Sequence, residues 1–246
     1  FPGAHGLTLI EEEGEERLWL TDHDTGEVSK TTLDGELLMT IEAPSVRSDE
    51  FYKPTWVAVA PESSDIYVAD GYGTNVVRIY DKKGRYQGEL TGEEGPGRFA
   101  RPHGIAFSTK GELWVTDRRR KRVLVYDNRG NCLRYRDGLT HSPCSFAFDH
   151  SLVFVPELFG SLKVLTAGLE LVAELGANAE VRPPGGWKDK EAWGWPELEG
   201  WPDLKGTTKV QAGRFISPHD VAVASNGDLY VVEWIVGGRI TRLAKI

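Results

Sequence analysis

Three of the six histidines in this chain occupy the same place in a repeated motif. The segments "GAHGLTLI", "RPHGIAFS" and "SPHDVAVA" have as their third residues His5, His103 and His219. Neutral imidazoles that converge on one point suit Zn²⁺, and three protein ligands with an open fourth position are the pattern of a catalytic zinc site. The alternative is that these histidines are remnants of the repeat, each hydrogen-bonded to a neighbour. Because three of them share one register, we favour a metal site.

Two further segments carry other residue types at this third position, which we call the slot. "KPTWVAVA" carries Thr55 and "SPCSFAFD" carries Cys144 at the third position. Cys144 is a possible extra ligand that would close the site into a structural one, but free cysteine usually behaves as a small buried apolar residue, and we favour that interpretation. The remaining histidines, His23, His141 and His150, lie outside the register and are interpreted as solvated loop residues.

The slot residues open a repeated set of short strands. Each is followed by a second strand that ends in an acid, as in "RLWLTD", "DIYVAD", "ELWVTD", "LVFVPE" and "DLYVVE", and then by a third strand. The first four units add a fourth strand, and Asp-Gly, Lys-Gly or Asn-Gly turns separate the alternating apolar runs. Repeats of roughly 40 to 50 residues with four strands each are typical of β-propeller blades.

The predicted fold is therefore all-β, one propeller domain of residues 1–246 with blades at about 1–46, 51–95, 97–138, 139–176 and 213–246. The fifth unit has only three strands, so we expect a ring of five blades or of six with one preceding Phe1. The last blade is then expected to expose its outer edge or pair it with another chain. Residues 177–212, rich in Trp, Pro and Gly, are expected to form a lid or wall beside the histidines, or else a wedge between two blades.

Propeller topology places particular side chains on one face. The start of every first strand and the loop after every second strand lie at the same end of a blade. These loops bring Tyr72 and Arg118 to the slot residues. The strand-ending acids, Asp70 and Asp117 among them, are expected to bind backbone amides of neighbouring loops. The basic run "RRRKR" is interpreted as a solvated loop, with Arg118 as the exception because it directly follows its strand.

The composition excludes several classes of protein. The chain has 246 residues, 40% hydrophobic and 27% charged, with a net charge of −8, which argues against nucleic acid as a partner. No apolar run is long enough to span a membrane. Two cysteines make no disulfide framework, so a soluble protein is expected with its compartment left open. The start at Phe1, with Met39 as the single Met, suggests a processed product or a fragment.

The repeats resemble NHL repeats, and over nearly its full length the chain resembles the lyase domain of peptidylglycine α-amidating enzymes. "VADGYGTNVVRI", "GRFARPHGIAF" and "SPHDVA" are the most specific matches. The resemblance implies a catalytic zinc on His5, His103 and His219, with Tyr72 and Arg118 as catalytic residues. It also implies a possible calcium site at Asp220 and the carbonyl of Leu7, which is the second cofactor expected.

The same resemblance implies the reaction, the cleavage of a peptidyl α-hydroxyglycine into a peptide amide and glyoxylate. The expected partner is thus a small-molecule or peptide-derived substrate. Three departures bear on the substrate: the family's other functional arginine belongs to a first blade that this chain lacks, its disulfide cysteines are absent, and Cys144 and the insertion are extra. The alternatives are a non-enzymatic NHL propeller that serves as an interaction platform and, ranked last, a lactone hydrolase.

Overall fold

The computed structural model describes residues 1–41, 43, 51–182 and 210–245. In these residues the regular structure is nineteen β-strands and one 3-10 turn, η1 (Arg118–Arg120), so the all-β prediction is confirmed. The strands form five antiparallel sheets, and in each sheet neighbouring strands are consecutive in the chain. Five such meanders are the blades of the predicted β-propeller. Residues 177–212 fall mostly outside the described residues, and the predicted lid or wedge lies there.

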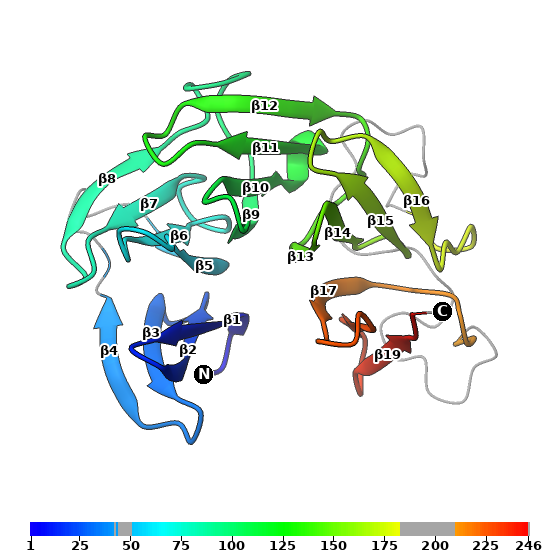
Figure 1. Ribbon diagram of the computed structural model, residues 1–246, viewed down its shortest axis with the longest axis horizontal. Coiled ribbons are helices and arrows are strands. Elements are labelled where there is room, and N and C mark those ends of the chain that lie inside the picture. Colours follow the sequence, from blue (N-terminus) through cyan, green and yellow to red (C-terminus); the bar gives the residue numbers. More distant parts are fainter. Residues whose placement is uncertain (42, 44–50, 183–209, 246) are drawn as a thin grey trace. The chain divides into compact units, whose positions relative to one another are not determined.

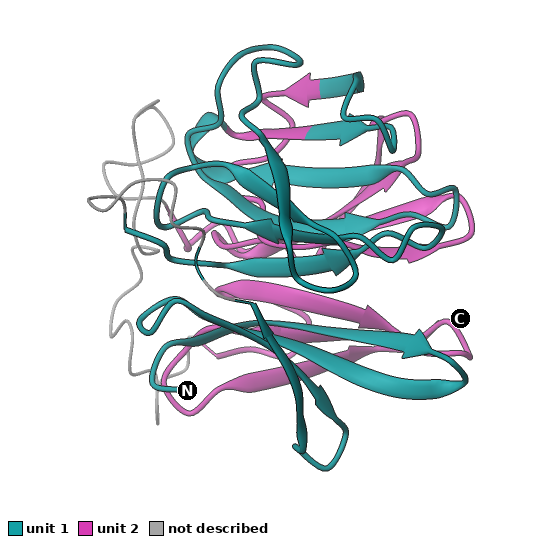
Figure 2. Ribbon diagram, turned by 90° about the vertical axis from the view of Figure 1, so that its left-hand side faces the viewer, with its two compact units in different colours: residues 1–120, 124–135 teal, residues 121–123, 136–246 magenta. Residues whose placement is uncertain are grey.

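The chain divides into two compact units, the first of residues 1–120 and 124–135 and the second of residues 121–123 and 136–246 (Figure 2). The first unit holds two complete sheets and most of a third. The strands of the complete sheets are β1 (Ala4–Glu12), β2 (Glu15–Asp22), β3 (Glu27–Thr32) and β4 (Leu37–Ile41), then β5 (Trp56–Val59), β6 (Ile66–Ala69), β7 (Val77–Tyr80) and β8 (Tyr86–Leu90). The third sheet has β9 (Pro102–Phe107), β10 (Leu113–Asp117), β11 (Arg122–Tyr126) and β12 (Cys132–Asp137).

The second unit holds the other two sheets. They consist of β13 (Ala147–Asp149), β14 (Leu152–Glu157), β15 (Ser161–Thr166) and β16 (Leu171–Leu175), followed by β17 (Pro218–Val223), β18 (Leu229–Glu233) and β19 (Arg239–Leu243). Only the last sheet has three strands among the described residues, as its sequence predicts. The outer strand β19 leaves the side chain of Ile240 71% exposed.

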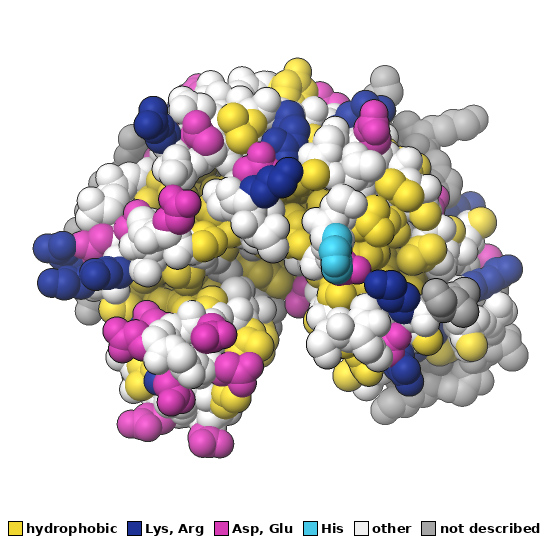
Figure 3. Space-filling model, viewed as in Figure 1, with side chains coloured by type: hydrophobic (Ala, Val, Ile, Leu, Met, Phe, Trp, Pro, Cys, Tyr) yellow, Lys and Arg dark blue, Asp and Glu magenta, His cyan; other side chains and the backbone are white. Residues whose placement is uncertain are grey.

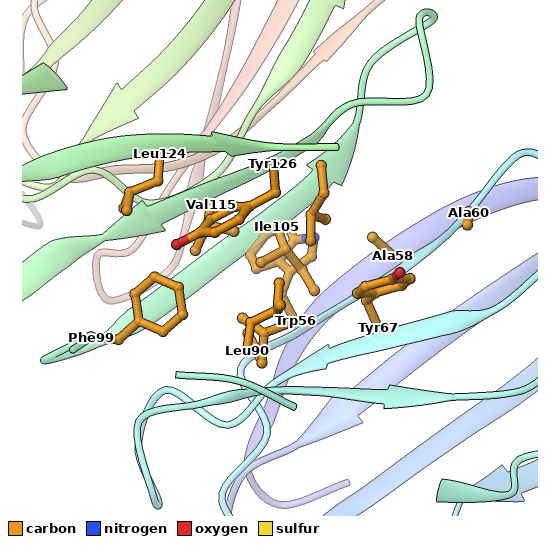
Figure 4. Close-up of a cluster of buried hydrophobic side chains, with 13 residues drawn as sticks. Trp56, Ala58, Ala60, Tyr67, Leu90, Phe99, Ile105, Val115, Leu124 and Tyr126 are labelled. Atoms are coloured by element: carbon orange, nitrogen blue, oxygen red, sulfur yellow. The ribbon is translucent and has the colours of Figure 1, made fainter. Parts of the chain in front are cut away.

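Apolar side chains of neighbouring sheets pack together inside each unit. In the first unit one cluster joins Trp56 and Tyr67 of the second sheet to Ile105, Leu124 and Tyr126 of the third (Figure 4). In the second unit Phe154 and Leu162 pack with Phe215, Val221 and Val231. Burying a large apolar side chain stabilises the fold by roughly 1.5–3 kcal/mol, so these clusters hold the strands that carry the site.

Charged side chains are scattered among hydrophobic and uncharged polar ones over the face in Figure 3. Acidic residues gather on the first sheet, where the β1–β2 hairpin contains Glu11, Glu12, Glu13, Glu15 and Glu16. This hairpin accounts for much of the chain's net charge of −8. No helix in the described part of the chain is long and apolar enough to cross a membrane.

Candidate functional site

Each sheet contains one internal clamp that fixes the residue in the slot. The acid that ends the second strand accepts a hydrogen bond from the backbone N–H of the residue two places before the slot. The acid-to-amide pairs are Asp22 to Gly3, Asp70 to Lys53, Asp117 to Arg101, Glu157 to Ser142 and Glu233 to Ser217, at 2.8–3.2 Å. The predicted structural role of these acids is confirmed. Because the clamp recurs, each slot residue follows it at the same spacing. The second residues of β1, β9 and β17 are His5, His103 and His219, whereas Thr55 directly precedes β5 and Cys144 lies three residues before β13.

Two of the predicted histidines meet inside the first unit. His5 Nε2 and His103 Nε2 lie 3.2 Å apart. The other nitrogen of His5, Nδ1, lies 2.8 Å from the carbonyl oxygen of Thr55. A carbonyl only accepts, so Nδ1 carries the ring proton and Nε2 keeps its lone pair. This is the arrangement in which a backbone carbonyl orients a metal-ligating histidine.

The hydroxyl of Tyr72 lies beside both rings. Its Oη is 3.2 Å from His5 Nε2 and 3.2 Å from His103 Nε2. Gly71 permits this placement, because a Cβ on Gly71 would come within 2.1 Å of the carbonyl oxygen of Pro102. The "DGY" motif therefore requires its glycine for a close backbone approach that brings Tyr72 to the histidines.

Arg118 completes the group of predicted residues in the first unit. It begins η1 immediately after β10, and its backbone N–H donates to the carbonyl of Arg101 at 2.9 Å. Its buried guanidinium donates to Tyr72 Oη at 3.2 Å and lies 3.1 Å from His103 Nδ1. Since a guanidinium only donates, His103 Nδ1 acts as the acceptor here and its ring proton lies on Nε2.

The electrostatics keep His5 neutral. Burial lowers its pKa from 6.5 to about 3, opposed by the hydrogen bond to Thr55 and reinforced by the charges of Arg118 and His23. A neutral imidazole whose Nε2 carries a lone pair and no proton is the form that binds zinc, so His5 fits a zinc site. His103 fits after one rearrangement: a metal on Nε2 places the ring proton on Nδ1, and the guanidinium of Arg118 must then turn away from that nitrogen.

The other predicted site residues lie as follows. His219 is the second residue of β17, as His103 is of β9 and His5 of β1. Asp220 follows it, and burial raises its pKa to about 6, opposed by hydrogen bonds from Ser145 and the Val221 amide. The side chain of Leu7 is 52% exposed. Cys144 is fully buried and packs with Leu158, Phe159, Val181 and Ile216.

Sequence reasoning missed two side chains at this site. The ring of His23 packs edge-on against His5 and Tyr72, with centroids 5.6 Å and 5.3 Å away, rather than standing free in solvent. Its position after the acid Asp22 matches that of Arg118 after Asp117, and this register could have identified it. Arg101 lies over the ring of Tyr72, with its guanidinium carbon 5.4 Å from the centroid. Its position two residues before His103 is the sequence signal that could have placed Arg101 at this site.

Comparisons with known proteins agree with this description. Residues 99–126 match the family model for the NHL repeat. The chain is thus a β-propeller of five meander sheets that contains a recognised NHL repeat in its third sheet. It is similar to human "NHL repeat-containing protein 3", with 30% identity over 135 residues, and to the Drosophila melanogaster protein "Peptidyl-alpha-hydroxyglycine alpha-amidating lyase 1", with 29% identity over 249 residues.

These alignments cover 50% and 93% of this chain, and 39% and 42% of the two relatives. The chain thus spans less than half the length of either. Among solved structures, virginiamycin B lyase from Staphylococcus aureus matches with a TM-score of 0.61 over 98% of this chain and 69% of that one. The two are 15% identical, which is a likeness of fold.

Proposed function

We propose that this protein is a zinc-dependent lyase that cleaves the C–N bond of a carbinolamine, with a peptidyl α-hydroxyglycine as its substrate class. The observation that carries the proposal is the contact of two imidazole Nε2 atoms, a tyrosine hydroxyl and a guanidinium, all 3.2 Å from their neighbours. Similarity to relatives named as amidating lyases supports it.

His5 and His103 supply two zinc ligands in this proposal, and His219 supplies the third. Each offers one ring nitrogen from the second position of its strand. Zinc, when bound, lowers the pKa of a coordinated hydroxyl and so favours loss of its proton. Thr55 holds His5 in the correct tautomer through its carbonyl oxygen.

Tyr72 and Arg118 perform the steps that belong to this chain. Tyr72 Oη acts as the general base that accepts the proton of the substrate hydroxyl. The electrons of that O–H bond form the C=O bond of glyoxylate, the C–N bond breaks, and the departing amide nitrogen takes up the proton that Tyr72 accepted. Arg118 binds the substrate carboxylate with two parallel N–H donors and fixes the carbon next to Tyr72. The contact of Arg118 with Tyr72 at 3.2 Å fits this division of roles.

A calcium ion bound by Asp220 and the Leu7 carbonyl belongs to the same proposal. Burial raises the pKa of Asp220 to about 6, so a cation would offset an unfavourable buried charge there. Cys144 is assigned no ligand role, because its sulfur is buried among apolar side chains and donates to the carbonyl of Ser142 at 3.4 Å.

Metal content and turnover test the proposal together. The purified protein should contain about one zinc per chain and convert an N-acyl-α-hydroxyglycine into amide and glyoxylate. His103→Ala should remove most of the zinc, and Tyr72→Phe should retain zinc but lose about 100-fold or more in turnover. His150→Ala is the matched control, since the His150 side chain is 88% exposed on a turn. Full turnover by protein stripped of metal would contradict the proposal.

A non-enzymatic interaction platform is the second candidate. The edge of β19, which pairs with no further strand among the described residues and leaves Ile240 71% exposed, favours it because strand edges bind extended segments. Intact zinc binding without turnover of any carbinolamine would support this candidate.

A further inference from the structure

Two guanidinium groups contact Tyr72. Arg118 donates to its hydroxyl at 3.2 Å, and the guanidinium carbon of Arg101 lies 5.4 Å from the centre of its ring. The proposed reaction uses Arg118 and leaves Arg101 without a role. A second arginine against the face of the same tyrosine therefore needs an explanation.

The backbone of the third sheet positions the two arginines as neighbours. The N–H of Arg101 donates to Asp117 Oδ1 at 2.8 Å, and the N–H of Arg118 donates to the carbonyl of Arg101 at 2.9 Å. The side chains thus leave the backbone from adjacent points of one clamp. Asp117 Oδ1 accepts hydrogen bonds from the backbone N–H groups of Ala100 and Arg101, so this oxygen of the carboxylate binds the backbone.

Arg101 and Arg118 both contact Tyr72, so their two positive charges share a partly buried place. Two like charges in a partly buried place repel each other, because the effective dielectric constant is lower there than in water. An anion held between them would offset this repulsion and gain charge-assisted hydrogen bonds from both.

We propose that Arg101 is a second anion-binding residue, which together with Arg118 holds the substrate carboxylate next to Tyr72 and selects substrates that carry it. The assignment of the anion as a substrate carboxylate rests on the proposed function. A small carboxylate suits two guanidinium groups that contact one tyrosine, because each group can donate two parallel hydrogen bonds to it. Arg101 is thus a specificity-determining residue that touches the substrate without entering the proton transfers.

Binding of glyoxylate, measured by calorimetry on the zinc-loaded protein, tests this directly. Arg101→Gln should weaken glyoxylate binding by about tenfold or more, since hydrogen bonds to charged groups contribute roughly 1.5–3 kcal/mol. Arg101→Lys should recover part of the loss, because it restores the charge without the planar fork. Arg119→Gln is the matched control: it removes the same charge from an exposed neighbour and should change binding by less than about twofold.

A pair of substrates separates this inference from the proposed function. N-acyl-α-hydroxyglycine and its uncharged glycinamide counterpart contain the same carbinolamine. Arg101→Gln should raise KM for the acid by about tenfold with little change in kcat, and leave the glycinamide unaffected. Turnover of the acid with unchanged KM in Arg101→Gln would overturn the role of Arg101 and leave the lyase standing. Arg101-dependent glyoxylate binding without turnover would overturn the lyase and support the anion site.

Discussion

Replacing Arg118 by methionine should strengthen zinc binding while it abolishes most of the activity. The guanidinium lies 3.1 Å from His103 Nδ1 and thereby favours the tautomer with its proton on Nε2, the nitrogen that zinc needs. A zinc ion must therefore displace this contact. A hydrogen bond from a charged donor contributes roughly 1.5–3 kcal/mol, so its removal should tighten the zinc Kd by about 10- to 150-fold.

Competition with a fluorescent zinc chelator at neutral pH measures this change. Methionine keeps an unbranched stem in the space of Arg118, and thermal unfolding would verify that the variant is folded. Arg119→Met removes the same charge from an exposed neighbour and should leave the Kd nearly unchanged. If Arg118→Met binds zinc no more tightly than Arg119→Met, the guanidinium does not compete with the metal and our interpretation of the His103 tautomer is wrong.

Three further outcomes are expected. His219→Ala should lower the zinc content to a small fraction of one ion per chain, measured by elemental analysis. A zinc content that stays near one per chain would show that His219 is not the third ligand. Because the folded-state pKa of His5 is about 3 against 6.5 for a free side chain, its contribution to stability is complete above pH 6.5 and is lost as the pH falls towards 3. Urea unfolding of chelator-treated protein should therefore show a stability that rises by up to about 1.4 kcal/mol per pH unit over this window, with a shallower slope in His5→Asn. Ile240→Lys, on the exposed edge strand, should reduce any concentration-dependent self-association seen by sedimentation, and an unchanged monomer–dimer ratio would exclude that edge as the contact.

The sequence alone predicts the strands of this protein because every blade repeats the same alternation. A period of two residues, closed by Gly-containing turns, specifies antiparallel pairing without knowledge of distant contacts. The strand-ending acids were interpretable for the same reason. Asp117 is one instance of a contact made in all five sheets, so its role could be inferred from the pattern.

The missing parts of the site are contacts between neighbouring sheets. Arg101 and Tyr72 belong to different blades, and nothing in either segment specifies that one side chain lies over the other. His23 was interpreted as solvated because it is outside the slot register, yet its ring packs edge-on against Tyr72 of the next sheet, with the centroids 5.3 Å apart. Such placements depend on how the sheets pack, which a local pattern does not contain.

The clamps also bear on how the site arises as the chain folds. Each acid and the amide that it binds are separated by only 15 to 19 residues, so the contact closes within one hairpin. Contacts between residues near in sequence form early and cost little chain entropy. A nascent blade can therefore fix its slot residue before the next blade has been synthesised. Each hairpin then contributes one slot residue independently of the others. Gain, loss or exchange of a single hairpin would change one metal ligand and leave the clamps that position the other ligands intact.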